Sequence, residues 1–253
     1  MLKKLLKARR ASASPAAAIP PGERVYAVGD VHGCDDLLGE LLLRIDADDA
    51  AREPARTTII FLGDLVDRGP ASAAVIERLR LLAASRPDTR FLLGNHEEVF
   101  VESLKGEPKA LRMFCRIGGR ETIISYGLAA ADYDRMDHEE LHAAMRARVP
   151  EEHETFLATF EDMIVIGDYA FVHAGIRPDT DFSNQRGSDL RWIRNPFLNH
   201  DRPFEKMVVH GHTISEDLDV QPHRIGVDTG AYETGRLTAL GLEGTSRWTL
   251  QAG

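Results

Sequence analysis

Short apolar runs alternate with helix-like patterns over the first hundred residues. Runs at Arg24–Val28, Thr57–Leu62 and Arg90–Leu93 each end at a glycine, which is typical of buried strands. Leucine and isoleucine at helical spacing predict a helix from Asp35 to about Ala47, and a second helical pattern covers Ser72–Ala84. Consecutive strand–loop–helix units predict parallel strands joined by right-handed crossovers.

The pattern then changes twice. Residues 46–56 are polar and predict a loop, whereas residues 97–160 are largely helical and predict a helical insertion. Short strands divided by Gly or Asp turns follow at Met163–Ile166, Tyr169–His173, Met207–His210, Arg224–Val227, Arg236–Leu242 and Arg247–Leu250. Strands that follow strand–helix units suggest a second sheet packed on the first. We therefore expect one α/β domain over residues 21–253.

The segment before this domain has a different character. Residues 1–10 are basic with three leucines, and residues 11–21 are rich in Ala, Ser and Pro. The apolar part is too short and too interrupted for a secretory signal. We expect residues 1–20 to form a flexible basic, Ala-rich tail, with a membrane-surface or partner helix as the alternative.

Composition narrows the function classes. The 253 residues are 43% hydrophobic and 28% charged, as in ordinary globular proteins, and the formal net charge is -9. This acidic balance argues against general nucleic-acid or membrane-surface binding. Two cysteines, Cys34 and Cys115, make no disulfide framework, and no apolar run approaches transmembrane length. We expect a cytoplasmic protein without stable membrane insertion; the sequence does not predict its oligomeric state.

Polar residues follow the apolar runs wherever a predicted strand ends. They are Asp30, His32, Asp64, Asn95, His173, and a histidine of the pair His210 and His212. Carboxylate, imidazole and amide ligands together suit Mn, Fe, Zn or Co. A central Asp64 could be shared by two ions about 3.5–4 Å apart, as in two-metal phosphoryl-transfer sites.

The stretch Gly63–Gly69 contains several candidate catalytic side chains. It places Asp64, Asp67 and Arg68 on a loop between a strand and a helix, where open α/β sheets bind ligands. The guanidinium of Arg68 offers a forked set of donors that fits a phosphate. The alternative interpretation is a turn with a surface ion pair.

Five ordered motifs together resemble a known family. They are GDVHG (Gly29–Gly33), GDLVDRG (Gly63–Gly69), GNHE (Gly94–Glu97), HAG (His173–Gly175) and GHT (Gly211–Thr213). The set resembles the phosphoprotein phosphatase branch of the calcineurin-like metallophosphoesterases, in its bacterial serine/threonine protein phosphatase form. The resemblance implies two packed mixed β-sheets flanked by helices, and two divalent metal ions, with Mn preferred and Fe, Zn, Co or Ni as alternatives.

The resemblance also implies residue roles. Asp30, His32 and His212 would hold one metal, Asn95 and His173 the second, and Asp64 both. A hydroxide bridging the metals would attack phosphorus directly. His96 would protonate the leaving group, and Asp67 would orient His96. Arg68 and Asn95 would bind the phosphate, with Arg194 of the segment Asp189–Arg194 as a further phosphate contact.

Each role has a simpler alternative. Asp30 could be a helix cap, Asn95 a turn residue, His173 a core histidine, and Cys34 a small apolar residue rather than a ligand. His210 and His212 could exchange roles. The sequence His138–His142 matches the zinc-protease pattern HExxH, but its charged neighbours predict a solvated surface and no third ligand follows at the usual distance.

The substrate is the least determined feature. In this resemblance, Asp67 and Glu97 favour a serine/threonine protein phosphatase, because dinucleoside tetraphosphatases with similar motifs commonly differ at both positions. A symmetrical dinucleoside tetraphosphate hydrolase and a non-catalytic phosphoprotein-binding module remain as alternatives. The expected partner is a phosphorylated protein or a small phosphoester, and no nucleic acid.

Overall fold

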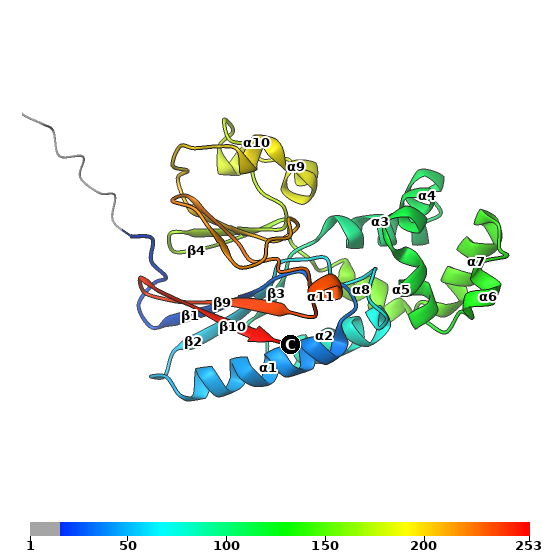
Figure 1. Ribbon diagram of the computed structural model, residues 1–253, viewed down its shortest axis with the longest axis horizontal. Helices are drawn as coiled ribbons and strands as arrows, with labels where there is room; N and C mark the ends of the chain where they lie inside the picture. The colour runs from blue at the N-terminus through cyan, green and yellow to red at the C-terminus, as the bar shows by residue number, and fades with distance from the viewer. Residues whose placement is uncertain (1–15) are drawn as a thin grey trace, which may run out of the picture.

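The computed structural model describes residues 16–253 and consists of two five-stranded mixed sheets packed face to face (Figure 1). The strand order is β10-β9-β1-β2-β3 in the first sheet and β4-β5-β6-β8-β7 in the second. Helices α1 and α2 cover the outer face of the first sheet, and α9 and α10 lie over the second. This arrangement confirms the predicted fold class.

The first half of the domain builds three parallel strands of the first sheet. Its elements are β1 (Glu23–Val28), α1 (Asp35–Ala50), β2 (Arg56–Phe61), α2 (Ser72–Ser85) and β3 (Thr89–Phe91). Strands β1 and β2 pair in parallel from Glu23↔Arg56 to Val28↔Phe61, and β3 extends the ladder beside β2. The predicted parallel pairing of these strands is therefore confirmed.

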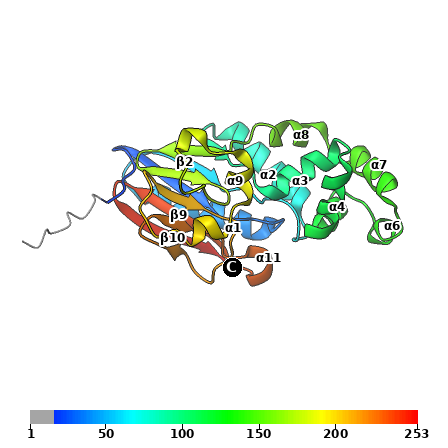
Figure 2. The ribbon, with the colours of Figure 1, turned by 90° about the horizontal axis from the view of Figure 1, so that it is seen from above.

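Helices occupy the segment between β3 and β4. They are α3 (Asn95–Leu104), α4 (Pro108–Ile117), α5 (Gly119–Ser125), α6 (Ala130–Tyr133), α7 (His138–Arg148) and α8 (Glu151–Leu157). Seen from above, most of this helical segment extends away from the two sheets on one side (Figure 2). Helices α3, α5 and α8 lie on the side of this segment toward the first sheet, and α4, α6 and α7 lie farther out.

The second half alternates strands with short helices. Its elements are β4 (Met163–Ile166), β5 (Tyr169–Val172), the 3-10 helix η1 (Phe182–Asn184), α9 (Gly187–Trp192), α10 (Asn195–Leu198), β6 (Met207–His210), β7 (Asp219–Val220), β8 (Arg224–Gly226), α11 (Ala231–Thr234), β9 (Leu237–Glu243) and β10 (Ser246–Ala252). The prediction that these strands form only the second sheet is wrong for β9 and β10. Strand β9 pairs antiparallel with β1 and extends the first sheet.

Strands buried on both faces explain the continuous apolar runs. Along β1, Val25 and Ala27 face the core between the sheets, whereas Tyr26 and Val28 face the helices. Along β2, Ile60 packs between the sheets and Phe61 packs under the helices. A strand with both faces covered shows no alternation of polar and apolar residues, because neither face meets water.

The predicted loop at residues 46–56 is partly wrong, because α1 continues to Ala50. The carboxylate of Asp48 accepts hydrogen bonds from Tyr26 and Trp248 of the sheet and from Arg52. The carboxylate of Asp49 accepts one from Arg24. The sheet thus holds the last helical turn through its polar residues, which a hydrophobic pattern cannot reveal.

The end of the predicted tail also differs from expectation. The N–H of Ile19 donates to Gly244, Ala18 exchanges hydrogen bonds with Asp168, and the side chain of Ile19 is buried. Residues 18–20 are therefore docked on the domain. The rest of the expected tail, residues 1–15, lies outside the described residues. Within residues 16–253, no helix has both the length and the apolar character that crossing a membrane requires.

Candidate active site

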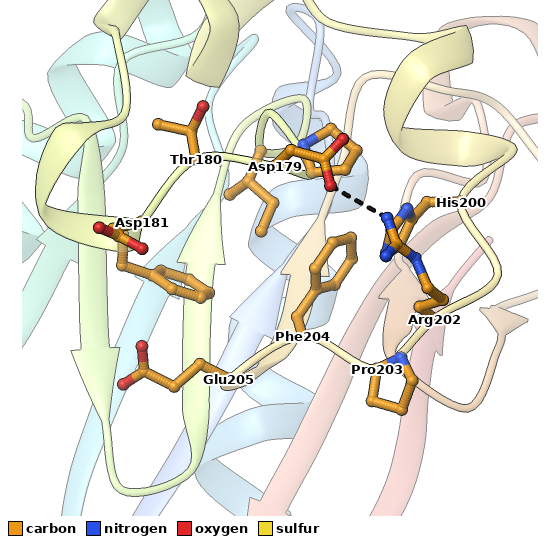
Figure 3. A pocket seen from close by; sticks show the side chains of 11 residues that line it. Asp179, Thr180, Asp181, His200, Arg202, Pro203, Phe204 and Glu205 are labelled. Atoms are coloured by element: carbon orange, nitrogen blue, oxygen red, sulfur yellow. Dashed lines mark hydrogen bonds and ion pairs between the residues drawn. The ribbon is translucent and has the colours of Figure 1, made fainter.

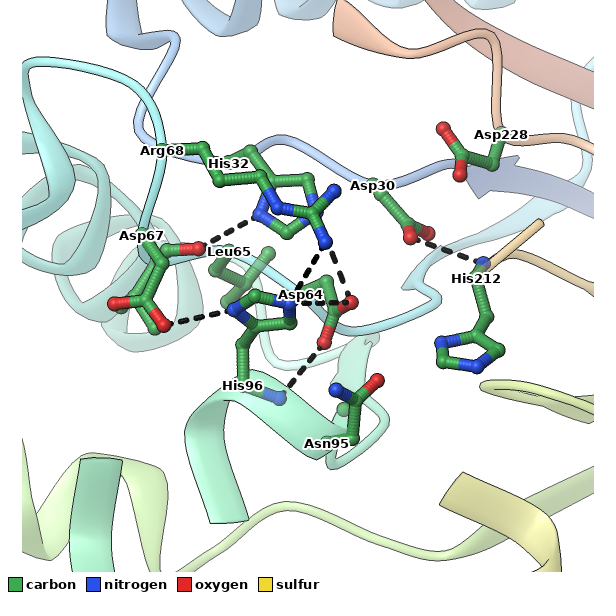
Figure 4. A network of polar contacts seen from close by, with 12 residues as sticks. Asp30, His32, Asp64, Leu65, Asp67, Arg68, Asn95, His96, His212 and Asp228 are labelled. Carbon is green, nitrogen blue, oxygen red and sulfur yellow. Dashed lines mark hydrogen bonds and ion pairs between the residues drawn. The ribbon is translucent and has the colours of Figure 1, made fainter. Parts of the chain in front are cut away.

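The sequence motifs meet where the two sheets end. Three parallel strands of the first sheet (β1, β2, β3) and three of the second (β5, β6, β8) each lead into a loop that carries a motif or an acidic residue. Carboxyl ends of parallel strands lie at one edge, so each sheet presents its polar residues together. Figure 4 shows Asp30, His32, Asp64, His96 and His212 gathered in one region, contributed by separate loops and by the start of α3.

Asp64 lies at the centre of this cluster. One carboxylate oxygen, Oδ1, accepts the N–H of His96 at 3.0 Å. The other oxygen, Oδ2, lies 3.7 Å from Nε2 of His32 and 3.4 Å from Nε2 of His173. The first histidine follows β1 and the second follows β5. A single buried carboxylate therefore stands between histidines contributed by both sheets.

Two groups of side chains have the chemistry and spacing of metal ligands, and they share Asp64. One group is Asp64, His32 and His96, and the other is Asp64, His173 and His212, with ligand atoms within 4.8 Å in each. By this spacing His212 groups with His173 rather than with His32, and His96, expected as the proton donor, groups with His32. Asp30 stands outside both groups but contacts the second, since its Oδ2 accepts the N–H of His212 at 2.9 Å.

The hydrogen bonds around the site leave ligand atoms free. Nδ1 of His32 lies 2.8 Å from the carbonyl oxygen of Val66, and Nδ1 of His173 lies 2.8 Å from that of Leu62. A carbonyl accepts the Nδ1 proton, so Nε2 of each ring keeps its lone pair for a cation.

Seven buried side-chain atoms have no hydrogen-bond partner within residues 16–253, and two of them belong to the cluster: Oδ1 of Asp30 and Nε2 of His212. An unsatisfied buried carboxylate oxygen and imidazole nitrogen are costly unless a ligand satisfies them. Oxygen and nitrogen donors in this mixture suit Mn, Fe, Zn or Co, so the residues present fit divalent ions.

The pKa shifts of the clustered side chains also indicate an environment that suits a cation. Burial raises the pKa of Asp30, and the nearby carboxylates of Asp228 and Asp64 raise it further. Burial lowers the pKa of His32 and of His212 to about 3, so both imidazoles are neutral at pH 7. Crowded buried carboxylates beside neutral imidazoles form an environment that attracts cations.

His96, a member of the first group, also forms a pair with Asp67. Nδ1 of His96 is 2.7 Å from Oδ2 of Asp67, and both side chains are almost fully buried. Nε2 of the same ring lies 3.2 Å from Nη2 of Arg68. Burial alone would lower the pKa of His96, but the carboxylates of Asp64 and Asp67 outweigh it and raise the pKa. When Nε2 carries a proton, both it and Arg68 are donors, and an oxygen atom placed between them would accept from both.

The backbone of these loops is strained. Within residues 16–253, the non-glycine residues with positive φ are His32 (43°), Asp64 (50°), Asp67 (71°), Arg68 (68°) and His212 (63°). Left-handed backbone is unfavourable for residues with a Cβ, and the surrounding structure must hold it in place. All of these residues belong to the predicted site, so the backbone strain lies at the candidate ligands and catalytic residues.

Glu97 has a structural role here. Its carboxylate accepts hydrogen bonds from four backbone N–H groups, those of Asp64, Leu65, Val66 and Gly94. The side chain is fully buried and ties the β2 loop to the start of α3. From sequence, Glu97 is one of the two residues that favour a serine/threonine protein phosphatase. Because both oxygens bind the backbone, this residue does not discriminate between substrates.

His210 and His212, which are two positions apart in the sequence, have different surroundings in the structure. His212 faces His173, with ring centroids 5.0 Å apart. His210 packs its ring edge-on against Phe197, and its Nε2 lies 3.4 Å from Nη1 of Arg224. His212 is therefore the member of the pair that lies in the cluster, as the motif predicts. Asn95 also lies there, with its Oδ1 3.0 Å from Nε2 of His173.

Arg194 lies at the rim of the cluster. Its side chain is exposed, and Nη1 donates to Oγ1 of Thr213, the residue after His212. The preceding helix α9 is tied to α3, because Nε1 of Trp192 donates to Glu98 at 2.6 Å and Arg191 pairs with the same carboxylate. The anchored α9 thus places Arg194 beside the predicted ligands.

Two residues at the site were not predicted from sequence. The carboxylate of Asp228, after β8, lies beside Asp30, and burial raises its pKa to about 6. The ring of Tyr232, on α11, lies 4.8 Å from Cζ of Arg68 and packs edge-on against His32 at 5.3 Å. Asp228 follows a strand, as the predicted ligands do. No sequence signal marks Tyr232.

A cavity of about 360 Å³ lies between the loop after β5 and the segment before β6 (Figure 3). Phe182 and Phe204 line it together with acidic side chains, and Asp179 pairs with Arg202 at 3.0 Å. None of the predicted ligands or catalytic residues lines this cavity. Its chemistry is therefore distinct from that of the cluster around Asp64.

The HExxH sequence lies on α7, far out on the helical segment (Figure 1). Asp137 caps this helix, and Nε2 of His142 lies 3.1 Å from the carbonyl oxygen of Leu104. Within residues 16–253, neither His138 nor His142 belongs to a group of side chains with metal-ligand spacing.

Comparison with known proteins identifies the family. The family model of the calcineurin-like phosphoesterases matches residues 23–237, which include every motif described above. The chain belongs to the calcineurin-like phosphoesterase family. As a metallophosphoesterase, it has the family's fold, and the family implies divalent metal ions, which the His and Asp groups of the cluster could bind. Neither the metal identity nor the substrate follows from this membership.

Similar proteins include several tetraphosphatases. The chain is 35% identical over 154 residues to a symmetrical bis(5'-nucleosyl)-tetraphosphatase of Acidovorax ebreus, covering 61% of this chain but 44% of that protein. It is 27% identical over 233 residues to the asymmetrical bis(5'-nucleosyl)-tetraphosphatase PrpE of Anoxybacillus flavithermus, covering 84% and 88%. The chain thus spans less than half the length of the first of these relatives.

Solved structures of the same fold are more distant in sequence. One is a crystal structure assigned as a candidate diadenosine tetraphosphatase, with a TM-score of 0.64 at 22% identity, covering 94% of this chain and 99% of that one. Another is a cold-active protein tyrosine phosphatase, with a TM-score of 0.54 at 20% identity, covering 92% and 81%. At these identities the likeness establishes the fold alone.

Proposed function

We propose that this metallophosphoesterase hydrolyses phosphate esters or anhydrides with two bound divalent ions. The observation that carries the proposal is the position of Asp64 between two groups of histidines, beside the Asp67–His96 pair and Arg68. Such ions lower the pKa of a bound water and neutralise charge on phosphoryl oxygens. Manganese is our first choice of metal.

The roles of the chain's own residues follow from their positions. No carboxylate of the described residues forms an ion pair with Arg68, so its guanidinium is available to bind and orient a phosphoryl oxygen. Nε2 of His96 faces the same space and would give a proton to the departing oxygen. Asp67 holds the opposite ring nitrogen, Nδ1, and keeps that tautomer. Arg194 would contact the substrate phosphate from the rim.

We infer that dinucleoside polyphosphates are the first substrates to test. The two bis(5'-nucleosyl)-tetraphosphatases described above align with 61% and 84% of this chain. The asymmetrical one also aligns over 88% of its own length. Glu97 does not oppose this inference, because its carboxylate binds only backbone N–H groups. Hydrolysis would place water on one phosphorus atom and release a nucleotide whose phosphate carries the departing oxygen.

A phosphoserine or phosphothreonine protein is the second candidate. The Asp67–His96 pair favours it, because a seryl or threonyl oxygen is a poor leaving group and needs a proton as its bond to phosphorus breaks. A nucleotide leaving through a phosphate oxygen needs that proton far less, since a phosphate is a much stronger acid than an alcohol.

The test is a substrate panel with the full chain. The protein is stripped with a chelator, reloaded with Mn, Co, Zn or Mg, and assayed on diadenosine tetraphosphate, phosphoserine peptides and bis-p-nitrophenyl phosphate. The proposal predicts metal-dependent turnover with the highest kcat/KM on the dinucleotide, and an inactive Asp64→Asn control. A higher kcat/KM on phosphopeptides would favour the second candidate. No metal-dependent turnover on any substrate would overturn both and favour a phosphoprotein-binding module.

A further inference from the structure

Thr122 connects the helical segment to the catalytic loop. It lies on α5, 55 residues beyond Asp67 in the sequence, and its side chain is fully buried. Its hydroxyl Oγ1 lies 2.7 Å from Oδ1 of Asp67. The same oxygen accepts the backbone N–H of Asp67 at 2.8 Å. One side chain thus binds both the carboxylate and the backbone of the residue that orients His96.

The direction of these hydrogen bonds can be assigned. An ionised carboxylate only accepts, so the single hydroxyl proton of Thr122 goes to Asp67. Ser72, at the start of α2, lies 3.0 Å from the same hydroxyl oxygen and must then be the donor between the two. With Oδ1 held by Thr122 and Oδ2 by His96, the Asp67 carboxylate has a fixed plane.

The neighbouring turn holds the next residue. The backbone carbonyl of Gly118, between α4 and α5, accepts the N–H of Arg68 at 3.1 Å. Asp67 and Arg68 are two consecutive residues with left-handed backbone, at φ of 71° and 68°. Consecutive non-glycine residues in this region need external support. The Gly118–Thr122 corner supplies it by binding the N–H groups of both.

We propose that Thr122 is a positioning residue for proton transfer by His96, acting through Asp67. This inference rests on the proposed phosphoesterase function and gives the helical segment a role in it. With the hydroxyl removed, Asp67 loses the donor on Oδ1 and can rotate, so the ring of His96 is no longer held in one orientation. Metal binding should not change, because Thr122 touches no predicted ligand of the described site.

The first test compares three variants in the full, metal-loaded chain. Thr122→Val removes the hydroxyl at nearly constant volume, and Thr122→Ser restores it. Ser125→Ala is the matched control, because Ser125 lies on the same helix and binds the N–H of Ala73 and the carbonyl of Thr122 without touching Asp67. Rates are measured on aryl phosphates whose leaving groups range from dinitrophenol to phenol.

The expected signature is a change that depends on the leaving group. For Thr122→Val, kcat on phenyl phosphate should fall by roughly 10- to 100-fold, since general acids contribute about 10²–10⁴-fold. Dinitrophenyl phosphate needs little protonation and should lose less than about threefold. Thr122→Ser should recover most of the rate, and Ser125→Ala should retain the wild-type dependence on the leaving group. An equal loss on all substrates would overturn the proposal.

A second readout does not require activity. In Zn-loaded protein, the proton between Nδ1 of His96 and Asp67 should give a low-field NMR signal, assigned by its loss in His96→Asn. The proposal predicts that Thr122→Val shifts or broadens this signal while Thr122→Ser and Ser125→Ala retain it. An unchanged signal in Thr122→Val would overturn the proposal, even if thermal stability falls. If the wild type hydrolyses no phosphoester, the proposed function fails, and this measurement still decides the positioning role.

Discussion

Nδ1 of His96 lies 2.7 Å from Oδ2 of Asp67, although the two residues are 29 positions apart, with Asp67 on the loop after β2 and His96 at the start of α3. The pair is buried, and the carboxylates of Asp64 and Asp67 raise the pKa of the imidazole. A histidine held in this way keeps one nitrogen fixed and presents the other to a substrate. This geometry suits the role of general acid that we propose for His96.

Replacement of His96 tests this role. We expect His96→Asn to lower kcat on substrates with alcohol leaving groups by about 10²–10⁴-fold, because the proton donor is lost. The effect on dinucleoside polyphosphates should be smaller. Metal content, measured by elemental analysis of the purified variant, should match the wild type. Loss of one ion would instead identify His96 as a ligand, which its grouping with His32 and Asp64 permits.

Arg68 should contribute to the transition state more than to substrate binding. By analogy with the loss of one oxyanion donor, Arg68→Ala should lower kcat/KM by about 3–4 kcal/mol in transition-state free energy. Arg68→Lys keeps the charge but loses the forked geometry, so it should recover only part of that rate. Steady-state kinetics of both variants separate kcat from KM. If the rate of Arg68→Ala equals that of the wild type, Arg68 is only a turn residue.

Much of this site could be predicted from sequence because each candidate ligand follows an apolar run and is flanked by glycine or another small residue. Asp30, Asp64 and His173 satisfy this rule, and the strands beneath them are buried on both faces. The division of ligands between the two groups could not be predicted in the same way. It depends on how loops from two different sheets face each other, and His212 lies beside His173 for that reason.

The sequence was least informative where side chains meet across long separations. Tyr232 reaches Arg68 from a short helix with no periodic pattern. Thr122 reaches Asp67 from the helical segment, where an isolated threonine in a helix carries no signal of a buried hydrogen bond. Strands β9 and β10 were placed in the wrong sheet, because strand patterns show burial but do not show the pairing partner.

The close approach of Gly211 to Asp30 makes a second test of the cluster. A Cβ at position 211 would lie 2.1 Å from Oδ1 of Asp30, so Gly211→Ala must displace this carboxylate. We expect weaker metal binding in calorimetry and lower activity. Gly39→Ala, on α1, is the control, because its Cβ would meet nothing closer than 3.6 Å. Equal metal affinity in both variants would remove Asp30 from the ligand set.

The polar end of α1 predicts a pH-dependent stability. Burial alone would raise the pKa of Asp48, but hydrogen bonds from Arg52, Tyr26 and Trp248 outweigh it and lower the pKa below 3.8. The ionised carboxylate therefore stabilises the fold above pH 3.8, and this contribution disappears as the pH falls through the lowered folded-state pKa.

We expect Asp48→Asn to lower the free energy of unfolding by about 1–3 kcal/mol at pH 7. The difference from the wild type should shrink as the pH falls below 3.8. Chemical denaturation across this pH range measures both effects. Asp46→Asn, on the same helix but more exposed, should change the free energy by less than about 0.5 kcal/mol. Equal effects of the two substitutions would contradict the assigned role of Asp48.

The central claim is that Asp64 is shared by two divalent ions. Anomalous diffraction from crystals of Mn-loaded protein tests it most directly. The account predicts two peaks roughly 3.5–4 Å apart with a carboxylate oxygen of Asp64 next to each. The histidines should divide between them, with His32 beside one peak and His173 and His212 beside the other. A single peak, or peaks away from Asp64, would contradict the account.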